Sequence, residues 1–504
     1  MGAFQNRLTA GTCLVGALML STAMMTATAG AQDLTVALPT SVNTLDPHNT
    51  ATVGTDLSVI SHLYTPLVIR GPDLALQPAL ATSWEAVDDL TWRFELRPGV
   101  SFVNGEPLDA EAVRWNIERV LDPDFNARVQ SWFRPIEEVR VIDDTTLEIV
   151  TNAPYPALAD QMSSFFLLPP QWTEAHNPAA EASSSGPYEL VEFVSGDRIV
   201  LQANDDYWGE APAFQTVEFR MMPEDSSRIA ALLANEADFV QYFPPSEIDR
   251  INESGRAEAS AISGIRFMLV KFNNLRPPFQ DNPDLRMAIN YAIDRQGIID
   301  SLFNGLGDIA NCQALSPAYF GYNADLEPAP YDPERARELL VSAGYPDGLE
   351  LDLEVPLGRY VQAQEIAQVI AAMLAEIGVD VNIIEMEFGA WLDKYRNAGD
   401  LGDMSYLGQA WPTLDADGLL TLFEPGNAYA YYENEQFGEL IREARSITDR
   451  DQRQDLYREA TQVMCEDPPH VPMFFQPTTY AVSNDIEWQV RPDDWVRAFD
   501  MAPR

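Results

Sequence analysis

The residue types that usually carry catalysis or hold metal ions are few in this chain and far apart. It has four histidines, His48, His62, His176 and His470, and only three cysteines. The histidines do not have the spacing of metal ligands. The motifs GxSxG, HExxH and CxxC, a P-loop, and a GxGxxG turn after a strand are all missing from the sequence. The sequence therefore favours neither a metalloenzyme nor a nucleophilic hydrolase, and we expect no cofactor.

Acidic residues are abundant, but their spacing does not indicate acid–base catalysis. With 77 Asp and Glu residues, close pairs such as Asp88-Asp89 are expected in solvated turns. The loop at residues 415–418 is only faintly like a calcium loop, because it lacks the closing glutamate. His470, beside two prolines, is interpreted as a structural residue.

The charge of the chain is strongly one-sided. Its 504 residues include 32 Lys and Arg, of which only Lys271 and Lys394 are lysines, and the formal net charge is −45. Such a surface repels phosphate backbones and anionic lipids, which disfavours nucleic-acid binding and peripheral membrane binding. Hydrophobic residues make up 46% of the chain, enough for large cores, and the length suggests two to four domains.

Residues 1–31 have the three-part plan of a secretory signal peptide. Arg7 precedes an apolar run at residues 13–20, and small residues follow up to Ala31. We expect cleavage after Ala31, with cleavage after Ala29 as the alternative. The run is too short to span a membrane comfortably, and Cys13 precedes most of it, whereas a lipid-anchored cysteine would follow it. The mature chain is expected to be a soluble periplasmic protein.

Cleavage would remove Cys13 and leave Cys312 and Cys465. An even pair of cysteines in an oxidising compartment favours a disulfide. Two buried thiols are the alternative, because the sequence does not supply the short Cα separation that a disulfide needs.

Local patterns predict a mixed α/β chain. Strands are expected at residues 34–38, 91–96 and 146–150, and a helix capped by Asp109 is expected at residues 110–120. From about residue 275 the expected helices are longer and better capped. Two of them are expected to begin at Pro283 and at Pro333, which follows the N-cap Asp332. Three more are expected to cover residues 364–376, 437–446 and 452–464, and a last strand is expected at residues 471–475.

Several separated blocks carry a family resemblance. Two long ones are LQPALATSWE at residues 76–85 and WRFELRPGVSFVNGEPLDAEAV at residues 92–113. Shorter blocks in the same series are LDPH at 45–48, GPY at 186–188, NDDYW at 204–208, FNN at 272–274, PPF at 277–279, LRMAI to AIDR at 285–295, and YDP to AGY at 331–345. Their ordered series resembles the extracellular solute-binding proteins of family 5, the dipeptide, oligopeptide and nickel receptors of ABC importers.

The resemblance implies a two-lobed periplasmic binding protein fold. It is the class II-like α/β fold of the large type, with an extra subdomain in lobe one. Lobe one would comprise residues 32–274 plus 471–504, and lobe two residues 275–470. Chain crossings near residues 271–274 and 468–473 would form the hinge.

The resemblance also implies ligand contacts in lobe two. Trp411 resembles a family block in which an acid follows a tryptophan and meets the α-ammonium group of a peptide, a role that suits a buried carboxylate. Here Asp415 stands four residues after the tryptophan instead of the usual three, so a loop or cap role is the alternative. Trp411 is expected in the pocket wall, with a core position as its alternative.

Three further candidates come from the same resemblance. Thr52 and Val53 match a loop that lines the site in relatives, and Ala51 occupies a position where oligopeptide receptors can carry an acid. Asn273, at the expected hinge, could offer its amide to a ligand or end a strand. The tyrosines within residues 429–432 could stack on a ligand or pack in lobe two.

The predicted function is capture of a peptide-like or other modest-sized polar solute by hinge closure. A ligand that touches both lobes favours the closed form, which the permease of an ABC importer would then accept. Opines, oligosaccharides and metal chelates are alternative ligands for the same fold. In the far field the negative charge favours cationic or zwitterionic solutes, although screening at ~8–10 Å limits this steering. We expect a monomer without enzymatic activity; a secreted hydrolase and a chaperone-like holder of unfolded chains are the alternatives from other classes.

Overall fold

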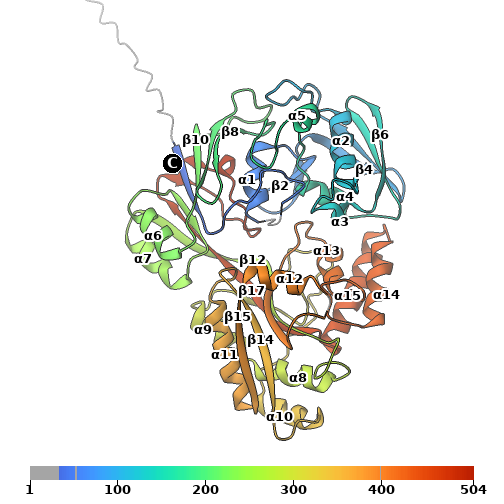
Figure 1. Ribbon diagram of the computed structural model, residues 1–504, viewed down its shortest axis with the longest axis vertical. Coiled ribbons are helices and arrows are strands. Elements are labelled where there is room, and N and C mark those ends of the chain that lie inside the picture. The colour runs from blue at the N-terminus through green and yellow to red at the C-terminus, as the bar shows by residue number, and fades with distance from the viewer. Residues whose placement is uncertain (1–32, 51–53, 398) are drawn as a thin grey trace, which may run out of the picture.

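Five apolar cores divide the molecule into two lobes (Figure 1). The computed structural model describes residues 33–50, 54–397 and 399–504, and the expected signal peptide lies outside them. Three cores are built from residues 34–262 and 480–501, which we call lobe one. Two cores are built from residues 265–475, which we call lobe two, and Leu74 of lobe one packs into one of them.

An eleven-stranded sheet runs through both lobes. Its strands in lobe one are β1 (Asp33–Leu38), β8 (Tyr188–Val194), β9 (Arg198–Ala203), β10 (Thr216–Met221) and β11 (Phe239–Gln241). Its strands in lobe two are β13 (Asp308–Ile309), β14 (Leu349–Leu357), β15 (Val379–Glu387) and β16 (Met404–Gln409). Because β1 lies parallel to β10 and β11, and β14 lies parallel to β15 and β16, each lobe has its own group of parallel strands.

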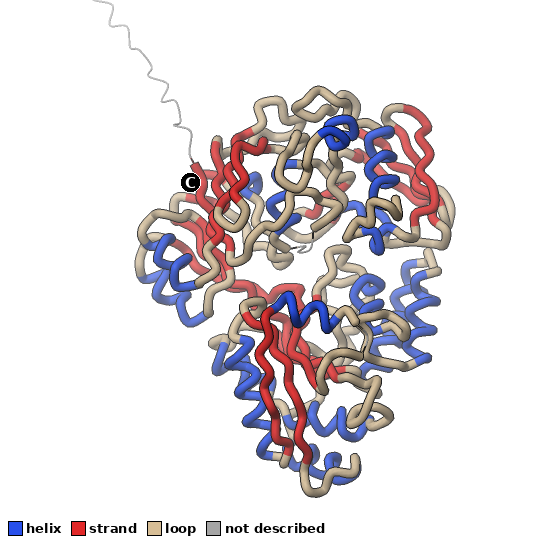
Figure 2. The backbone as a smooth tube through the Cα atoms, in the orientation of Figure 1, coloured by secondary structure: helices blue, strands red, loops and turns tan. Residues whose placement is uncertain are grey.

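Two long antiparallel strands, β12 (Ala257–Phe272) and β17 (His470–Ser483), join these groups (Figure 2). The full order is β15-β14-β16-β12-β17-β11-β1-β10-β9-β8, with β13 paired to β17 outside this path. The register of β12 on β17 is interrupted between Ser263 and Phe267. The same two strands therefore belong to both lobes, with a backbone irregularity between the two paired regions.

The interrupted register between β12 and β17 lies where the side chains of β12 pass from a core of lobe one to a core of lobe two. In β12, Ile262 packs against a core of lobe one, whereas Ile265 belongs to a core of lobe two. A Cβ atom on Gly264 would lie 2.8 Å from the carbonyl oxygen of Gln476. Glycine therefore allows the two backbones to approach closely where the chain leaves lobe one.

A four-stranded antiparallel sheet forms a separate subdomain of lobe one. Its strands are β4 (Ala81–Ala86), β5 (Thr91–Leu96), β6 (Ile136–Asp143) and β7 (Thr146–Thr151), in the order β4-β5-β7-β6. Helix α2 (Ala110–Leu121) shares an apolar core with this sheet. The predicted cap is confirmed, because the Asp109 carboxylate accepts a hydrogen bond from the Ala112 N–H at 3.0 Å.

The remaining elements of lobe one are short. They are α1 (Asp56–Leu63), β2 (Val68–Arg70), β3 (Leu76–Pro78), α3 (Gln130–Phe133), α4 (Leu158–Gln161), α5 (Pro170–Ala175), α6 (Asp225–Leu233) and α7 (Ile248–Glu253), with β18 (Ile486–Glu487) and β19 (Ala502–Pro503) near the C-terminus.

Lobe two has longer helices, as predicted from the sequence. They are α8 (Pro283–Ala292), α9 (Arg295–Leu302), α10 (Pro333–Ser342), α11 (Ala363–Glu376), α12 (Phe388–Tyr395), α13 (Ala416–Leu420), α14 (Glu435–Arg445) and α15 (Arg450–Glu466). The predicted N-cap Asp332 is confirmed, and Asn434 and Asp449 cap α14 and α15 in the same way. These caps start both helices two residues before the predicted positions.

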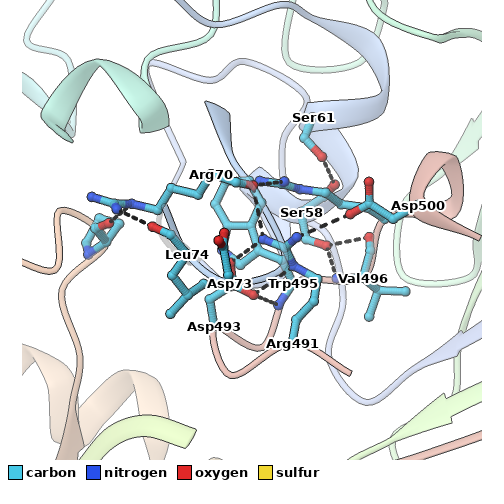
Figure 3. A network of polar contacts seen from close by, with 12 residues as sticks. Ser58, Ser61, Arg70, Asp73, Leu74, Arg491, Asp493, Trp495, Val496 and Asp500 are labelled. Carbon is cyan, nitrogen blue, oxygen red and sulfur yellow. Dashed lines mark hydrogen bonds and ion pairs between the residues drawn. The ribbon is translucent and has the colours of Figure 1, made fainter. Parts of the chain in front are cut away.

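The C-terminal segment returns to lobe one and is held there by a polar network (Figure 3). The Arg491 guanidinium lies between the carboxylates of Asp493 and Asp500, at 2.7 and 3.2 Å. Ser58 of α1 both donates to the carbonyl oxygen of Val496 and accepts from its N–H, each at 2.8 Å. The last residues of the chain are thereby fastened against its first helix.

Cys312 and Cys465 form a disulfide in lobe two, with their Cα atoms 5.0 Å apart. The bond joins the segment that follows β13 to the end of α15.

Candidate functional site

A cavity of ≈ 960 Å³ lies between the two lobes and is lined by both. Lobe one contributes residues of the loop at 39–43 and residues 223–228, which lead into and begin helix α6. Lobe two contributes residues of the loops at 358–362 and 410–414, and the C-terminal segment contributes residues 493–495 and 497. Segments from distant parts of the sequence therefore meet around one space, at the junction where a solute would touch both lobes.

Arginines and aromatic rings are prominent in the lining. Within the described part of the chain, these residues are Arg70, Arg228, Arg266, Arg359, Arg396, Arg497, Tyr242, Tyr360, Phe388, Trp411 and Trp495. Flat rings and guanidinium groups can stack on a solute and donate hydrogen bonds to it.

The loop between β14 and α11 presents Arg359 to the cavity. Gly358 has a φ of +72° and turns the chain immediately before it. The Arg359 guanidinium carbon lies 5.4 Å from the ring centre of Tyr360 and 5.9 Å from that of Phe388. Burial, and then the charge of Arg266, lower the pKa of Arg359. Its side chain has no hydrogen-bond or ion-pair partner among the described residues, so its donors remain available to a ligand.

Arg266 lies at the irregularity in β12 and has a buried acid as its partner. Its Nη2 atom is 3.4 Å from Oδ2 of Asp494, and Oδ1 of Asp494 accepts a hydrogen bond from Thr478 at 2.6 Å. Burial lowers the pKa of Arg266, but the charge and hydrogen bond of Asp494, together with the neighbouring Tyr242 and Tyr360, outweigh this effect and the net shift is upward. A positive charge is therefore maintained where the lobes meet.

Arg70 reaches from the end of β2 in lobe one to a loop of lobe two. Its Nε atom donates to the carbonyl oxygen of Pro412 at 3.2 Å, and Nη2 donates to the carbonyl oxygen of Thr413. The same guanidinium pairs with Asp160 of lobe one at 2.7 Å. These bonds hold the two lobes together beside the cavity.

Trp411 forms part of the cavity wall next to this contact. Its ring packs edge to face against Trp132 of lobe one, with ring centres 5.6 Å apart and an interplanar angle of 66°. Its backbone N–H donates to the Tyr319 hydroxyl at 2.8 Å. A Cβ atom on Gly418 would collide with the Trp411 ring, so this glycine allows the ring to lie against α13.

The sequence profile of the bacterial extracellular solute-binding proteins, family 5, matches residues 75–430. The chain belongs to this family. It is therefore a solute-binding protein, in a family of binding proteins and not of enzymes.

Relatives of this solute-binding protein cover nearly the whole chain. The glutathione-binding protein GsiB of Salmonella paratyphi A is 28% identical over 480 residues, which are 92% of this chain and 93% of the relative. The peptide-bound DppA of Helicobacter pylori has a TM-score of 0.83 at 24% identity, covering 94% of this chain and 98% of that one. AgaA of A. tumefaciens R10, in complex with agropinic acid, has a TM-score of 0.80 at 25% identity, covering 94% and 99%. The predicted α/β binding-protein fold is confirmed by these likenesses.

Asp415 of the solute-binding protein does not contribute to the lining of this cavity among the described residues. Its carboxylate is buried and accepts from Arg453 through both oxygens, at 2.6 and 2.5 Å. It also caps α13 by accepting from the N–H of Asp417 at 2.9 Å. Burial raises the pKa of Asp415, and Arg453 opposes this effect. The expected contact with a ligand ammonium group is replaced here by a guanidinium of the protein itself.

Asn273 is also engaged within the protein. Its amide donates to the carbonyl oxygens of Gly399 and Leu401, at 3.2 and 2.8 Å, and its side chain is buried. Like Asp415, it does not belong to the described lining of the cavity. The position at the end of β12 matches the alternative role, a strand end fastened to a neighbouring loop.

Thr52 and Val53 lie outside the described residues, although Gly54 and Thr55, which follow them, line the cavity. The tyrosine cluster packs inside lobe two, where the hydroxyl of Tyr431 donates to the carbonyl oxygen of Asn397 at 2.8 Å.

Sequence reasoning missed the arginines of the cavity. Arg70, Arg266 and Arg359 stand in three unrelated segments, and no motif joins them. The one available signal was the near-complete use of arginine in place of lysine, since arginine is the residue that binds planar anionic groups bidentately.

Proposed function

We propose that this protein is the periplasmic receptor of an ABC importer and captures a peptide-like or other modest-sized polar solute by closure of its two lobes. The observation that carries the proposal is the cavity of ≈ 960 Å³ with walls from both lobes. A solute held there contacts both lobes at once, so its binding energy favours the closed form. The permease subunits would recognise that form.

The hinge is proposed at Gly264 in β12 and at Pro477 in β17. Ser263 pairs with Pro477 just before the register breaks, and the cores change lobe at the same level. This division falls inside the two strands, whereas the family resemblance implied crossings near residues 271–274 and 468–473. Only two backbone strands would need to bend when the lobes open.

The peptide-like class of ligand is supported by the relatives. GsiB is named for glutathione, a small peptide, and its similarity extends over both lobes. The second candidate is an opine, because AgaA was solved with agropinic acid. A cavity of ≈ 960 Å³ has room for solutes of either kind.

Export to the periplasm with cleavage after Ala31 belongs to the same proposal. It is supported by the extracellular location that the family description gives. Mass spectrometry of the protein recovered from a periplasmic extract tests it, since the mature chain should begin at Gln32. Recovery of the uncleaved chain from the cytoplasm would contradict export.

A thermal-shift screen with peptides, opines, oligosaccharides and metal chelates tests the receptor function. One solute class should raise the melting temperature, because binding to the folded state adds about 2.7 kcal/mol at a hundredfold excess over Kd. The solute should be recovered chemically unchanged. Product formation, or no stabilisation by any solute, would reject a receptor role.

Within the site, Trp411 is proposed as part of the ligand-contacting wall, together with Thr52 and Val53. Trp411→Ala should weaken binding of the identified solute at least about tenfold, the loss expected from removing a buried aromatic contact. Trp172→Ala is the matched control, because that tryptophan stacks on His176 with ring centres 4.6 Å apart and does not contribute to the described lining. Equal affinity of both variants would remove Trp411 from the site.

A further inference from the structure

The charge of the cavity runs against the charge of the chain. The whole sequence has 32 basic and 77 acidic residues. The described lining has six basic side chains, all arginine, against five acidic ones. The described lining of the cavity therefore carries a small positive formal charge, although the protein as a whole is strongly negative. Low-dielectric walls strengthen the electrostatic field that such charges exert on a solute in the cavity.

The five acids are either already paired or lie toward solvent. Asp494 pairs with Arg266, and Asp493 pairs with Arg491 behind the lining. The other three, Glu224, Asp225 and Glu365, are exposed or half-exposed. No acid in the described lining is both buried and free, so the cavity offers no desolvated carboxylate to a ligand ammonium group.

Most of the arginines of the lining, in contrast, have no acidic partner in the described part of the chain. Arg228 and Arg497 are 2% and 3% exposed and donate only to carbonyl oxygens, such as those of Tyr242 and Arg70. The side chains of Arg359 and Arg396 have no hydrogen-bond or ion-pair partner among the described residues. Four of the six guanidinium groups thus lack a carboxylate, and a charge held next to a cavity without a counter-ion is costly unless a ligand supplies one.

We propose that the solute is an anion with at least one carboxylate held by Arg359, and that it needs no ammonium group for binding. This inference rests on the proposed receptor function and narrows its ligand class. A carboxylate fits a guanidinium through two parallel hydrogen bonds. The flanking rings of Tyr360 and Phe388 restrict the orientation of that guanidinium. The depressed pKa of Arg359 agrees, because an anion would relieve the repulsion from Arg266.

Matched tripeptides test the charge requirement directly. The set is Glu-Ala-Glu, Gln-Ala-Gln and Lys-Ala-Lys, each with an amidated C-terminus, so that only the Glu side chains supply carboxylates. Each peptide is prepared with a free and with an acetylated N-terminus and is measured by calorimetry on the mature wild-type protein. Acetylated Glu-Ala-Glu should bind at least about tenfold more tightly than its Gln counterpart, the size of one charge-assisted hydrogen bond. Its acetylated and free forms should differ less than about threefold.

Two arginine variants assign the effect to the cavity. Arg359→Gln should weaken binding of the acidic peptide at least about tenfold, and Arg396→Gln, at the exposed edge, should weaken it less. Arg335→Gln is the control, because Arg335 lies on α10 in lobe two and pairs with Glu338 in solvent. Thermal unfolding without ligand shows whether each variant is folded.

The outcomes separate the inference from the function on which it rests. Binding of the Gln or Lys peptides as tight as that of the Glu peptide, a requirement for the free ammonium group, or unchanged affinity in Arg359→Gln would overturn the inference and leave the receptor function standing. If the acidic peptides fail but neutral or cationic solutes of the wider screen bind, the inference is likewise overturned. If no solute of any class binds, the receptor function itself fails.

Discussion

Arg453 and Arg359 are two arginines of lobe two that both lie near aromatic rings but differ in their polar partners. Each guanidinium lies near two aromatic rings, at 5.0 and 5.1 Å for Arg453 and at 5.4 and 5.9 Å for Arg359. Arg453 has the carboxylate of Asp415 against it, whereas Arg359 has no carboxylate and borders the cavity. The ion pair of Arg453 with Asp415 is expected to stabilise the fold, whereas the unpaired guanidinium of Arg359 is expected to bind the ligand. Stability and binding should therefore respond in opposite ways to changes at the two positions.

The largest expected effect comes from breaking the neutralised pair. Asp415→Asn should lower the free energy of unfolding by about 3–5 kcal/mol, because it leaves the buried guanidinium of Arg453 without a counter-charge. Denaturant unfolding measures the loss. Asp455→Asn is the control, since its ion pair with Arg458 is 4.0 Å long and solvent-exposed, and such pairs contribute about 0–1 kcal/mol. A loss at Asp415 no larger than at Asp455 would remove the distinction between the two arginines.

Asp415 also marks how far the sequence could predict this molecule. Local signals were sufficient for the helix starts, since Asp109 and Asp332 cap their helices through residues only three positions away. The role of Asp415 is decided by Arg453, 38 residues further along the chain. Spacing from Trp411 contains no information on such a partner, so the sequence leaves both a ligand contact and a loop or cap role open for Asp415.

The same limit applies to the positive cavity. Arg70, Arg266 and Arg359 come together only because β2, β12 and the loop after β14 converge where the lobes meet. Composition gave the total charge of −45 and so favoured cationic or zwitterionic solutes in the far field. The sign inside a cavity depends on which charges are neutralised by neighbours, and this follows from the fold alone.

The two lysines extend the comparison from the cavity to the core. Lys271 is 1% exposed, its Nζ atom has no hydrogen-bond partner among the described residues, and it lies 4.3 Å from the ring centre of Phe423. Lys394 pairs with the buried carboxylate of Glu354. Lys271 is thus unpaired like Arg359 but does not belong to the described lining of the cavity between the lobes, so its burial should cost stability.

Lys271→Met should therefore raise the free energy of unfolding, by about 2 to 4 kcal/mol at pH 7. Burial lowers the pKa of Lys271 from 10.5 to about 7. Between these values the unfolded chain binds the extra proton, so wild-type stability rises with pH across that window, and the variant should lose this slope. Unfolding curves from pH 6 to 10 measure it.

The matched variant at the other lysine should act in the opposite direction. Lys394→Met strands the carboxylate of Glu354, which is 2% exposed, and should destabilise the protein. If both lysine variants were destabilising, the favourable contact of Lys271 with the Phe423 ring would exceed the free-energy cost of burying its charge. A buried unpaired charge would then no longer mark a position that lowers stability.

The smallest effect on stability is expected at Arg359. Arg359→Gln removes no ion pair or hydrogen bond to a described residue, so the free energy of unfolding without ligand should change by no more than about 0.5 kcal/mol. A small gain would agree with relief of the repulsion from Arg266. The affinity for the solute should fall in the same variant, whereas Asp415→Asn should reduce stability and leave the affinity of the folded fraction unchanged. A loss of stability at Arg359 comparable with that at Asp415 would mean that the fold itself depends on this guanidinium, and Arg359 would then join Arg453 as a residue of the scaffold.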